Sequence, residues 1–362
     1  MRPDILELDA SFRTLSLDFH PEAHDLEAIR LLLTGNSVID WRKLSFESPE
    51  QVNRFLETLL FDMSDPQDQR RVRYVYNEAV SYLEEHLKLR FPQELRNPKD
   101  VRQVLLWASA HEGSMRRQKL SCIILKLMHV ILHMEAADLK FRTPVSEHQL
   151  MELAKERVFQ AAEKMRGAGV PIVSFYGSQK SRSSVITKLL AKQESVAATV
   201  FDKLRFRIVV PRREDLAPTL GYLTRNVVPY NYTIPQQSLN TLLSSEDLME
   251  GLTELERSVL ESGPDILHGS PNHFSGASYR SINFIVDFPV RIPEPSAGDL
   301  FYELGRTLFV LVEFQLIDEE TARLNEQGEN AHYLYKNRQH QTIAQRLKSG
   351  RPRSPDDTGT AS

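Results

Sequence analysis

A stretch near the middle of the chain, FYGSQKSRSSVITKLL, places cations and hydroxyls directly after a short apolar run. Gly177 and Ser178 end that run, and a glycine between a strand and a helix permits a sharp turn and the close approach of a ligand. The first N–H groups of the following helix attract anions such as phosphate. Lys180, Ser184 and Lys188 are four residues apart and share one side of that helix. The pattern suits a polyphosphate; a solvated basic helix face is the alternative.

Two acids stand in predicted strands. Asp202 begins FDKLRFRIVV, and Glu313 lies in the apolar run FVLVEFQLI with Gln315 on the same face. Burying a carboxylate is costly unless it binds a metal or pairs with a cation. Two carboxylates from neighbouring strands are what a magnesium ion that carries nucleotide phosphates needs. The alternative is a structural salt bridge to one of the nearby cations Lys203, Arg205 and Arg207.

A tyrosine opens a further strand in SGASYRSINFIVDF. Gly276 and Ser278 precede Tyr279, so the ring follows a stretch of small residues. A tyrosine at the mouth of a strand can stack on a nucleobase. A partly buried packing residue is the alternative.

Two histidines, His129 and His133, are four residues apart with Glu135 close by. That spacing allows a metal pair. No third ligand stands at an informative spacing, and the surrounding segment has the composition of a core helix. We therefore expect buried, hydrogen-bonded histidines.

The first part of the chain, residues 1–165, is predicted to be mostly helical because apolar residues recur at helical spacing. Ser48 precedes Pro49 and is expected to cap one helix. The most apolar helix is expected at Ser114–Lys140. Another is expected to start at Ser146 and to stop at Gly167 or Gly169.

The pattern then changes to short strands separated by helical segments. VPIVSFYG, FDKLRFRIVVP, YRSINFIVDFPV and RTLFVLVEFQLID are rich in β-branched and aromatic residues. We therefore predict an α+β fold: a helical region at 1–165, a mixed-sheet domain flanked by helices at 166–346 and a disordered tail at 347–362.

Composition narrows the class of protein. The chain has 362 residues, 41% hydrophobic, with a formal net charge of −4. That charge provides no global field for duplex DNA. A single cysteine, Cys122, excludes a disulfide framework and favours a reducing compartment, so we expect a cytoplasmic protein. We expect neither a signal peptide nor a membrane span. Nothing in the sequence predicts an oligomeric state.

The order of these motifs resembles the synthetase domain of RelA/SpoT-type alarmone synthetases over roughly residues 160–340. The resemblance implies a nucleotidyltransferase-like fold and the magnesium-dependent transfer of pyrophosphate from ATP to the 3′-hydroxyl of GDP or GTP. It does not extend to residues 1–165, where no His-Asp motif predicts an alarmone hydrolase.

The resemblance also implies roles for individual residues. Asp202 and Glu313 would be the catalytic residues and the Mg²⁺ ligands. Tyr279 would stack on the acceptor guanine. The nucleotide-binding set would be Gly177, Ser178, Lys180, Ser184, Lys188, Arg207, Tyr279, Ser281 and Gln315. The family's C-terminal motif falls on Ala331, His332, Tyr333, Tyr335 and Lys336.

Three positions depart from the family pattern. Ser178, Asn283 and Ile317 stand where the family usually has arginine, histidine and arginine. These positions normally help to hold phosphates. Two alternatives therefore stay open: a toxin-like pyrophosphokinase acting on adenine nucleotides or on tRNA 3′ ends, and a non-catalytic nucleotide sensor.

Overall fold

The computed structural model describes residues 4–6, 23–34, 46–109, 113–191, 202–249, 257, 266, 278–293, 304–327 and 332–349, with the backbone alone at 4–6, 23, 249, 332–335, 346, 348 and 349. The helices and strands along the chain are β1 Asp4–Leu6, α1 Ala23–Thr34, α2 Pro49–Thr58, α3 Pro66–Glu85, α4 Gln93–Arg96, α5 Arg102–Ser109, α6 Met115–Arg142, α7 Glu147–Gly167, β2 Ser174–Gln179, α8 Arg182–Ala191, β3 Leu204–Val210, η4 Arg213–Asp215, α9 Leu216–Asn226, η5 Tyr230–Tyr232, β4 Leu239–Asn240, α10 Ser245–Met249, β5 Ile282–Arg291, β6 Thr307–Asp318, α13 Glu319–Asn325 and α14 His332–Ser349.

Helix starts in the first part of the chain follow the capping residues in the sequence. The Ser48 hydroxyl accepts from the backbone N–H of Gln51, and Ser146 does the same for Gln149. In both helices the glutamine side chain accepts a hydrogen bond from the backbone N–H of the capping residue, which completes a capping box. Ser114 caps α6. The predicted helix starts are therefore confirmed.

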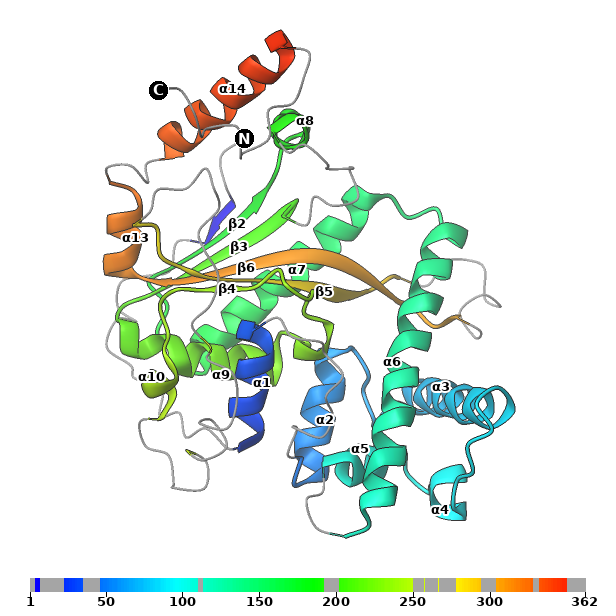
Figure 1. Ribbon diagram of the computed structural model, residues 1–362. Helices are drawn as coiled ribbons and strands as arrows, with labels where there is room; N and C mark the ends of the chain where they lie inside the picture. Colours follow the sequence, from blue (N-terminus) through cyan, green and yellow to red (C-terminus); the bar gives the residue numbers. More distant parts are fainter. Residues whose placement is uncertain are drawn as a thin grey trace, which may run out of the picture.

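A six-stranded mixed sheet forms the centre of the molecule, in the order β1-β2-β3-β6-β5-β4. β3 and β6 run parallel, and the other neighbours are antiparallel. With helices on both sides (Figure 1), this confirms the predicted α+β class. Two strands were not predicted: β4, which pairs with β5, and β1, at the start of the chain, which pairs with β2 so that Asp4 lies opposite Gly177.

Alternation along the strands gives the sheet two unlike faces. On β3, Phe206 and Ile208 are fully buried, whereas Arg205 and Arg207, which alternate with them, point to the other face. A row of phenylalanines crosses the apolar face: Phe206 stacks on Phe314 at 5.9 Å between ring centroids, and Phe314 stacks on Phe284 at 5.5 Å. Such pairs add about 0.5–1.5 kcal/mol each beyond area burial. The row fixes which side of the sheet faces the core.

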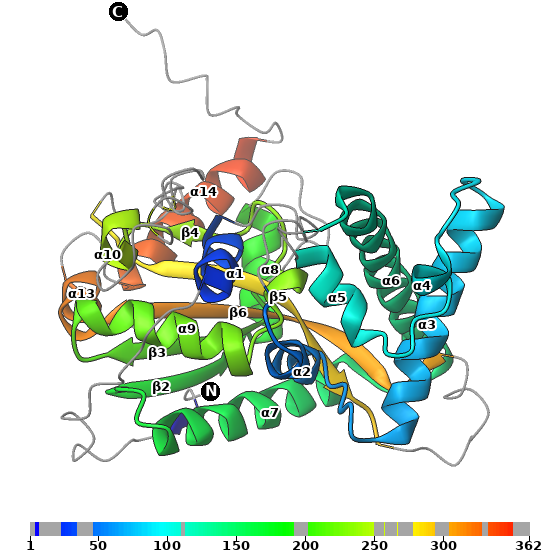
Figure 2. The ribbon, with the colours of Figure 1, turned by 90° about the horizontal axis from the view of Figure 1, so that it is seen from below.

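Helices α1, α2, α7 and α9 lie on the apolar side of the sheet (Figure 2). Phe159 of α7 packs edge-on against Phe206, with 5.8 Å between ring centroids. On the opposite side α8 and α14 pack against each other above β2 and β3 (Figure 1). The polar face of the sheet therefore looks toward α8 and α14.

Helices from the first part of the chain share one hydrophobic core with the sheet. Leu26 of α1, Val75 of α3 and Phe314 of β6 belong to the same buried cluster. Helix α6 packs on α3 and α5 and also contacts β6. In the described part of the chain it is the one helix long and apolar enough to cross a membrane. This is weak evidence for a membrane span, because core helices of soluble proteins have the same composition.

Some expected features lie outside the described residues. Gly276, Ala331 and residues 350–362 of the predicted tail are not described. The same holds for the side chains of His332, Tyr333 and Tyr335.

Candidate functional site

The parallel register of β3 and β6 determines the centre of the candidate site. Arg205 lies opposite Glu313, and Arg207 lies opposite Gln315. Arg205 Nε donates to Glu313 Oε2 at 2.7 Å, and Arg207 Nε donates to Gln315 Oε1. Glu313 is 6% exposed. The Glu313 carboxylate raises the pKa of Arg205, so the guanidinium stays charged at all ordinary pH values.

Asp202 lies in the turn that leads into β3, just before the strand rather than in it. Its carboxylate accepts hydrogen bonds from Lys180 Nζ at 2.6 Å and from Lys188 Nζ at 2.5 Å, and Arg205 Nη2 lies 3.6 Å away. Burial opposes ionisation of Asp202, but the two ammonium groups outweigh it and hold the pKa of the carboxyl well below its usual range. Burial lowers the pKa of Lys180, and the charge of Arg205 acts in the same direction.

The two lysines reach Asp202 from different places. Lys188 belongs to α8, whereas Lys180 precedes that helix and donates its backbone N–H to the Lys203 carbonyl at 2.8 Å. The expectation that both lysines lie on one helix is therefore wrong in detail, although they do converge. Ser184 takes no part in this convergence: its hydroxyl lies 2.9 Å from that of Ser181, at the start of α8.

Gly177 is not a turn glycine. It lies within β2, opposite Phe206, and a Cβ placed on it would come within 2.9 Å of Phe159 Cζ. The glycine is needed for close packing on the apolar face, so the prediction that the chain turns at Gly177 is wrong. The chain turns instead at Lys180 and Ser181, beyond the exposed Ser178.

Tyr279 joins the site through Gln315. Gln315 Nε2 donates to the Tyr279 hydroxyl at 2.7 Å, and Arg207 holds the oxygen of the same amide. The Tyr279 ring is half-buried. Ser281, two residues on, is buried; its backbone N–H donates to the Thr241 hydroxyl, and its carbonyl accepts from the same hydroxyl. Tyr279 therefore lies beside the polar face of the sheet.

The electrostatics of this face favour an anion. Lys180, Lys188 and Arg205 contact the carboxylates of Asp202 and Glu313, and Arg207 lies on the same face, held by Gln315. The face therefore has an excess of positive charge next to the start of α8. Such an arrangement suits the phosphates of a nucleotide.

The donor set can be tested for magnesium. Mg²⁺ is usually held by one or two carboxylates together with substrate phosphates, and no group of three or more His, Cys, Asp or Glu that could hold a metal occurs in the described part of the chain. Asp202 and Glu313 both reach Arg205 and supply that carboxylate pair. Asn283 Oδ1, opposite Gln315 in the sheet, is buried without a hydrogen-bond partner among the described residues. The two carboxylates fit a hard cation, provided that Arg205 yields its place.

Sequence reasoning gave two residues a lesser role than the structure does. Arg205 appeared as one of three candidates for a structural salt bridge, and Asn283 as a departure from a family motif. The signal for Arg205 was its period-2 spacing from Arg207, which places both on one face. The register with β6, which no local pattern reveals, then places Arg205 between the two carboxylates.

The histidine pair lies away from this face. His133 Nε2 lies 2.5 Å from Asp287 Oδ2, and the side chain is 51% exposed. His129 packs against Tyr232, with 4.2 Å between ring centroids, and its Nδ1 is buried without a hydrogen-bond partner in the described part of the chain. The prediction of buried, hydrogen-bonded histidines is therefore only half correct for each residue. His133 has a hydrogen-bond partner but is half exposed, whereas His129 Nδ1 is buried but has no partner among the described residues.

Comparisons with known proteins end the description of the site. No family model matches the sequence, and no curated protein does either. Among solved structures the chain is similar to small alarmone synthetase 1 from Bacillus subtilis, at 14% identity, covering 56% of this chain and 90% of that chain with a TM-score of 0.30. A second structure of that enzyme, bound to its product pppGpp, is 13% identical, covering 56% and 98%, with a TM-score of 0.30.

A GTP pyrophosphokinase family protein from Streptococcus pneumoniae is 14% identical, covering 56% of this chain and 84% of that chain, with a TM-score of 0.29. These proteins are of the class that the sequence motifs resemble, and the chain is divergent from them.

Proposed function

We propose that this protein is a nucleotide pyrophosphokinase that transfers pyrophosphate from ATP to the 3′-hydroxyl of a guanine nucleotide. The observation that supports it most is the convergence of Lys180, Lys188 and Arg205 on the carboxylates of Asp202 and Glu313 on one face of the sheet. Catalysis of phosphoryl transfer consists mainly of positioning and charge neutralisation, and this face supplies both.

The donor ATP would lie with its triphosphate along the cationic side of the face. Lys180 and Lys188 are held ready by Asp202, and each can turn an N–H toward a phosphate oxygen while keeping that contact. Arg207 is fixed by Gln315, which leaves its remaining N–H groups for the same ligand. Binding would therefore require little rearrangement of these three side chains.

Asp202 and Glu313 would hold Mg²⁺, which when bound would neutralise charge on the triphosphate. Arg205 occupies the space between the two carboxylates, so its guanidinium would move to a phosphate oxygen as the nucleotide enters. The protein thus keeps two buried acids paired with a cation before the ligand arrives.

The acceptor would bind on the Tyr279 side. Its base would stack on the half-buried ring, whose hydroxyl is fixed by Gln315. Glu313 accepts from Arg205 through Oε2, and its Oε1 has no partner in the described part of the chain. Oε1 is the atom that would take the proton from the attacking 3′-hydroxyl.

Incubation with ATP labelled in its β- and γ-phosphates, Mg²⁺ and a panel of acceptors tests the proposal. GDP, GTP, AMP, ADP and uncharged tRNA are supplied singly. We expect label to appear as pyrophosphate on GDP or GTP, and Glu313→Gln to abolish the transfer. Transfer to adenine nucleotides or tRNA alone would identify a toxin-like enzyme. Saturable nucleotide binding with no transfer to any acceptor would identify a sensor and contradict the proposal.

A further inference from the structure

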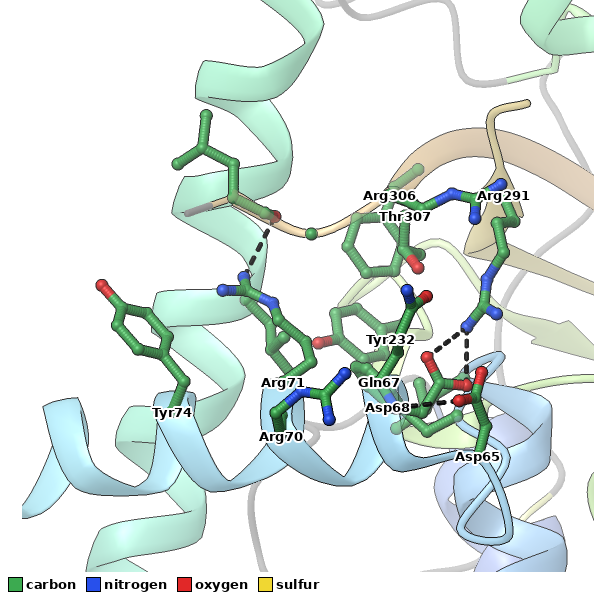
Figure 3. A pocket seen from close by; sticks show the side chains of 16 residues that line it. Asp65, Gln67, Asp68, Arg70, Arg71, Tyr74, Tyr232, Arg291, Arg306 and Thr307 are labelled. Atoms are coloured by element: carbon green, nitrogen blue, oxygen red, sulfur yellow. Dashed lines mark hydrogen bonds and ion pairs between the residues drawn. The ribbon is translucent and has the colours of Figure 1, made fainter. Parts of the chain in front are cut away.

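A second pocket lies apart from the candidate site, with a volume of about 500 Å³ (Figure 3). Its floor is α3, and its roof is formed by the ends of β5 and β6 around Arg291 and Thr307, which pair with each other. Glu313 lies six residues further along β6, about 20 Å away at 3.3 Å per residue. The contact of His133 on α6 with Asp287 on β5 stands between the two places. The pocket is therefore separate from the candidate active site.

One side of the pocket is apolar. Tyr232 and Phe309 stack there with 4.6 Å between ring centroids, and Leu59, Phe61 and Leu132 extend the surface. Tyr232 is 4% exposed, and its hydroxyl is buried without a hydrogen-bond partner among the described residues. A buried phenol without a partner costs free energy unless something supplies one. This wall therefore offers a flat apolar surface together with a polar group that lacks a partner.

The other side of the pocket is rich in arginine. Arg70 and Arg71 rise from α3, and Arg291 reaches down from β5 (Figure 3). Arg306, just before β6, lies at the upper edge of the pocket and donates to the Ile292 carbonyl at 3.4 Å. The two lining acids are already engaged. Asp68 accepts from Arg291 Nη2 at 2.9 Å through both oxygens, and Asp65 caps α3 by accepting from the Gln67 N–H.

Two of these arginines are fixed in position. Arg71 pairs with Glu135 of α6 and donates to the Leu304 carbonyl at 3.0 Å. Gly305 has a φ of +76°, and a Cβ on it would lie 2.7 Å from Arg71 Nε, so only glycine leaves room for this arrangement. Arg291 is held by Asp68, and its Nε is buried without a partner in the described part of the chain. These two side chains thus hold the shape of the pocket before any ligand arrives, which lowers the cost of binding.

We propose that this pocket binds a phosphorylated small molecule with a flat apolar body, about the size of a mononucleotide. Guanidinium groups match phosphate oxygens in pairs, which a single lysine does not. The stacked aromatic wall takes the flat body, and the volume lies within the range of small-molecule sites. The ligand's phosphate meets Arg70 and Arg306, and its body covers Tyr232 and Phe309.

Three probes separate the parts of this proposal: 1-naphthyl phosphate, 1-naphthol and inorganic phosphate, each titrated into the full chain by calorimetry. We expect saturable binding of 1-naphthyl phosphate, and binding of each fragment at least about tenfold weaker. Arg70→Ala/Arg306→Ala should weaken 1-naphthyl phosphate at least about tenfold. Tyr74→Ala, an exposed pocket residue, should weaken it less. The control is Arg142→Ala, an exposed arginine on α6 outside the pocket, which should change nothing.

The Lys180→Ala/Lys188→Ala protein distinguishes this pocket from the proposed active site. Retained binding of 1-naphthyl phosphate in that protein, with loss in the arginine variant, supports the pocket. The reverse pattern overturns it. Absence of saturable binding in the wild-type protein, or equal binding of 1-naphthol and 1-naphthyl phosphate, overturns it as well. A fold disturbed by the arginine substitutions would appear as a lowered melting temperature, and Arg70→Ala alone then provides the test because Arg70 is exposed.

Discussion

Arg205 and Glu313 lie opposite each other in the parallel register of β3 and β6, and the guanidinium of Arg205 extends from Glu313 to Asp202. The two acids that the proposed reaction needs are therefore joined by a cation that the protein itself supplies. A buried carboxylate without such a partner would be strongly unfavourable. Arg205 thus competes with any metal ion for the same oxygens.

Replacing Arg205 tests that competition directly. Arg205→Gln should lower the melting temperature, because Glu313 is left buried without its cation. It should also strengthen Mn²⁺ binding in the absence of nucleotide, by at least about tenfold. Mn²⁺ should restore part of the lost melting temperature, because a ligand that binds only the folded state stabilises it.

The matched control is Glu313→Gln in the Arg205→Gln protein, which should remove the gain in Mn²⁺ affinity. Calorimetric titration measures both proteins. Unchanged Mn²⁺ affinity in Arg205→Gln would mean that Asp202 and Glu313 do not form a metal site.

Lys188 should contribute more to the affinity for ATP than to the stability of the folded protein. Lys188→Ala removes one cation from Asp202 but leaves Lys180 and Arg205 near the same carboxylate. A hydrogen bond from a charged group contributes about 1.5–3 kcal/mol, so the Kd for ATP should rise about tenfold to a hundredfold. Lys203→Ala is the control, because Lys203 pairs with Glu147 of α7 instead. A large loss of melting temperature with unchanged Kd would favour a purely structural role.

The sequence predicted the α+β class, the helix starts at Ser48 and Ser146, and a set of polar residues on strands. These features depend on local signals: capping side chains, and alternation with a period of two or 3.6 residues. The pairing of β3 with β6 joins residues more than a hundred positions apart. Local patterns contain no information about such a register, so the place of Arg205 between two acids could not be predicted.

Gly177 illustrates a different limit. Its position after an apolar run predicted a turn, because glycine favours turns. The same residue is also favoured wherever a side chain needs space, and here that side chain is Phe159 of α7. The deciding contact comes from a helix that precedes the strand, so the sequence around Gly177 did not contain it.

Gly177→Ala distinguishes the two roles of that glycine. The added methyl group would push into Phe159 and Phe206, and overpacking of a core costs about 1–3 kcal/mol. We expect a lower melting temperature with the Kd for ATP changed less than about twofold. Ser178→Ala, at an exposed neighbouring position, is the control for stability. A higher Kd for ATP with normal stability would show that Gly177 contributes to ATP binding.

The contact between His133 and Asp287 should depend on pH. The hydrogen bond to Asp287 raises the pKa of His133 above its usual 6.5. A raised pKa gives stability that is fully present below about pH 6.5 and is lost as the pH rises through the folded-state value. His133 is half exposed, so the effect should stay below about 1 kcal/mol. Melting temperatures from pH 6 to pH 9 should fall more in the wild-type protein than in Asp287→Asn.

His129 should act in the opposite direction. Burial lowers the pKa of His129 to about 4, so the neutral form is favoured in the folded protein. Stability should then decline as the pH falls from about 6.5 toward 4. His129→Gln should flatten the acid side of the melting curve and leave the alkaline side unchanged. Equal acid-side slopes in both proteins would contradict this assignment.

Tyr279 is expected to bind the base of the acceptor nucleotide in the proposed reaction. Its ring is half-buried, and its hydroxyl accepts from Gln315 Nε2 at 2.7 Å. Stacking on a base contributes about 1–3 kcal/mol, so Tyr279→Ala should raise the Kd for GDP about tenfold to a hundredfold and leave the Kd for ATP nearly unchanged. Tyr279→Phe keeps the ring but leaves the amide of Gln315, which is 1% exposed, without this acceptor. That change should lower the melting temperature rather than the affinity, because an unsatisfied buried donor costs about 1–3 kcal/mol. Titration of GDP and ATP into the three proteins measures both effects. Equal affinity for GDP in wild type and Tyr279→Ala would remove Tyr279 from the acceptor site, and loss of GDP affinity in Tyr279→Phe as large as in Tyr279→Ala would assign recognition to the hydroxyl rather than the ring.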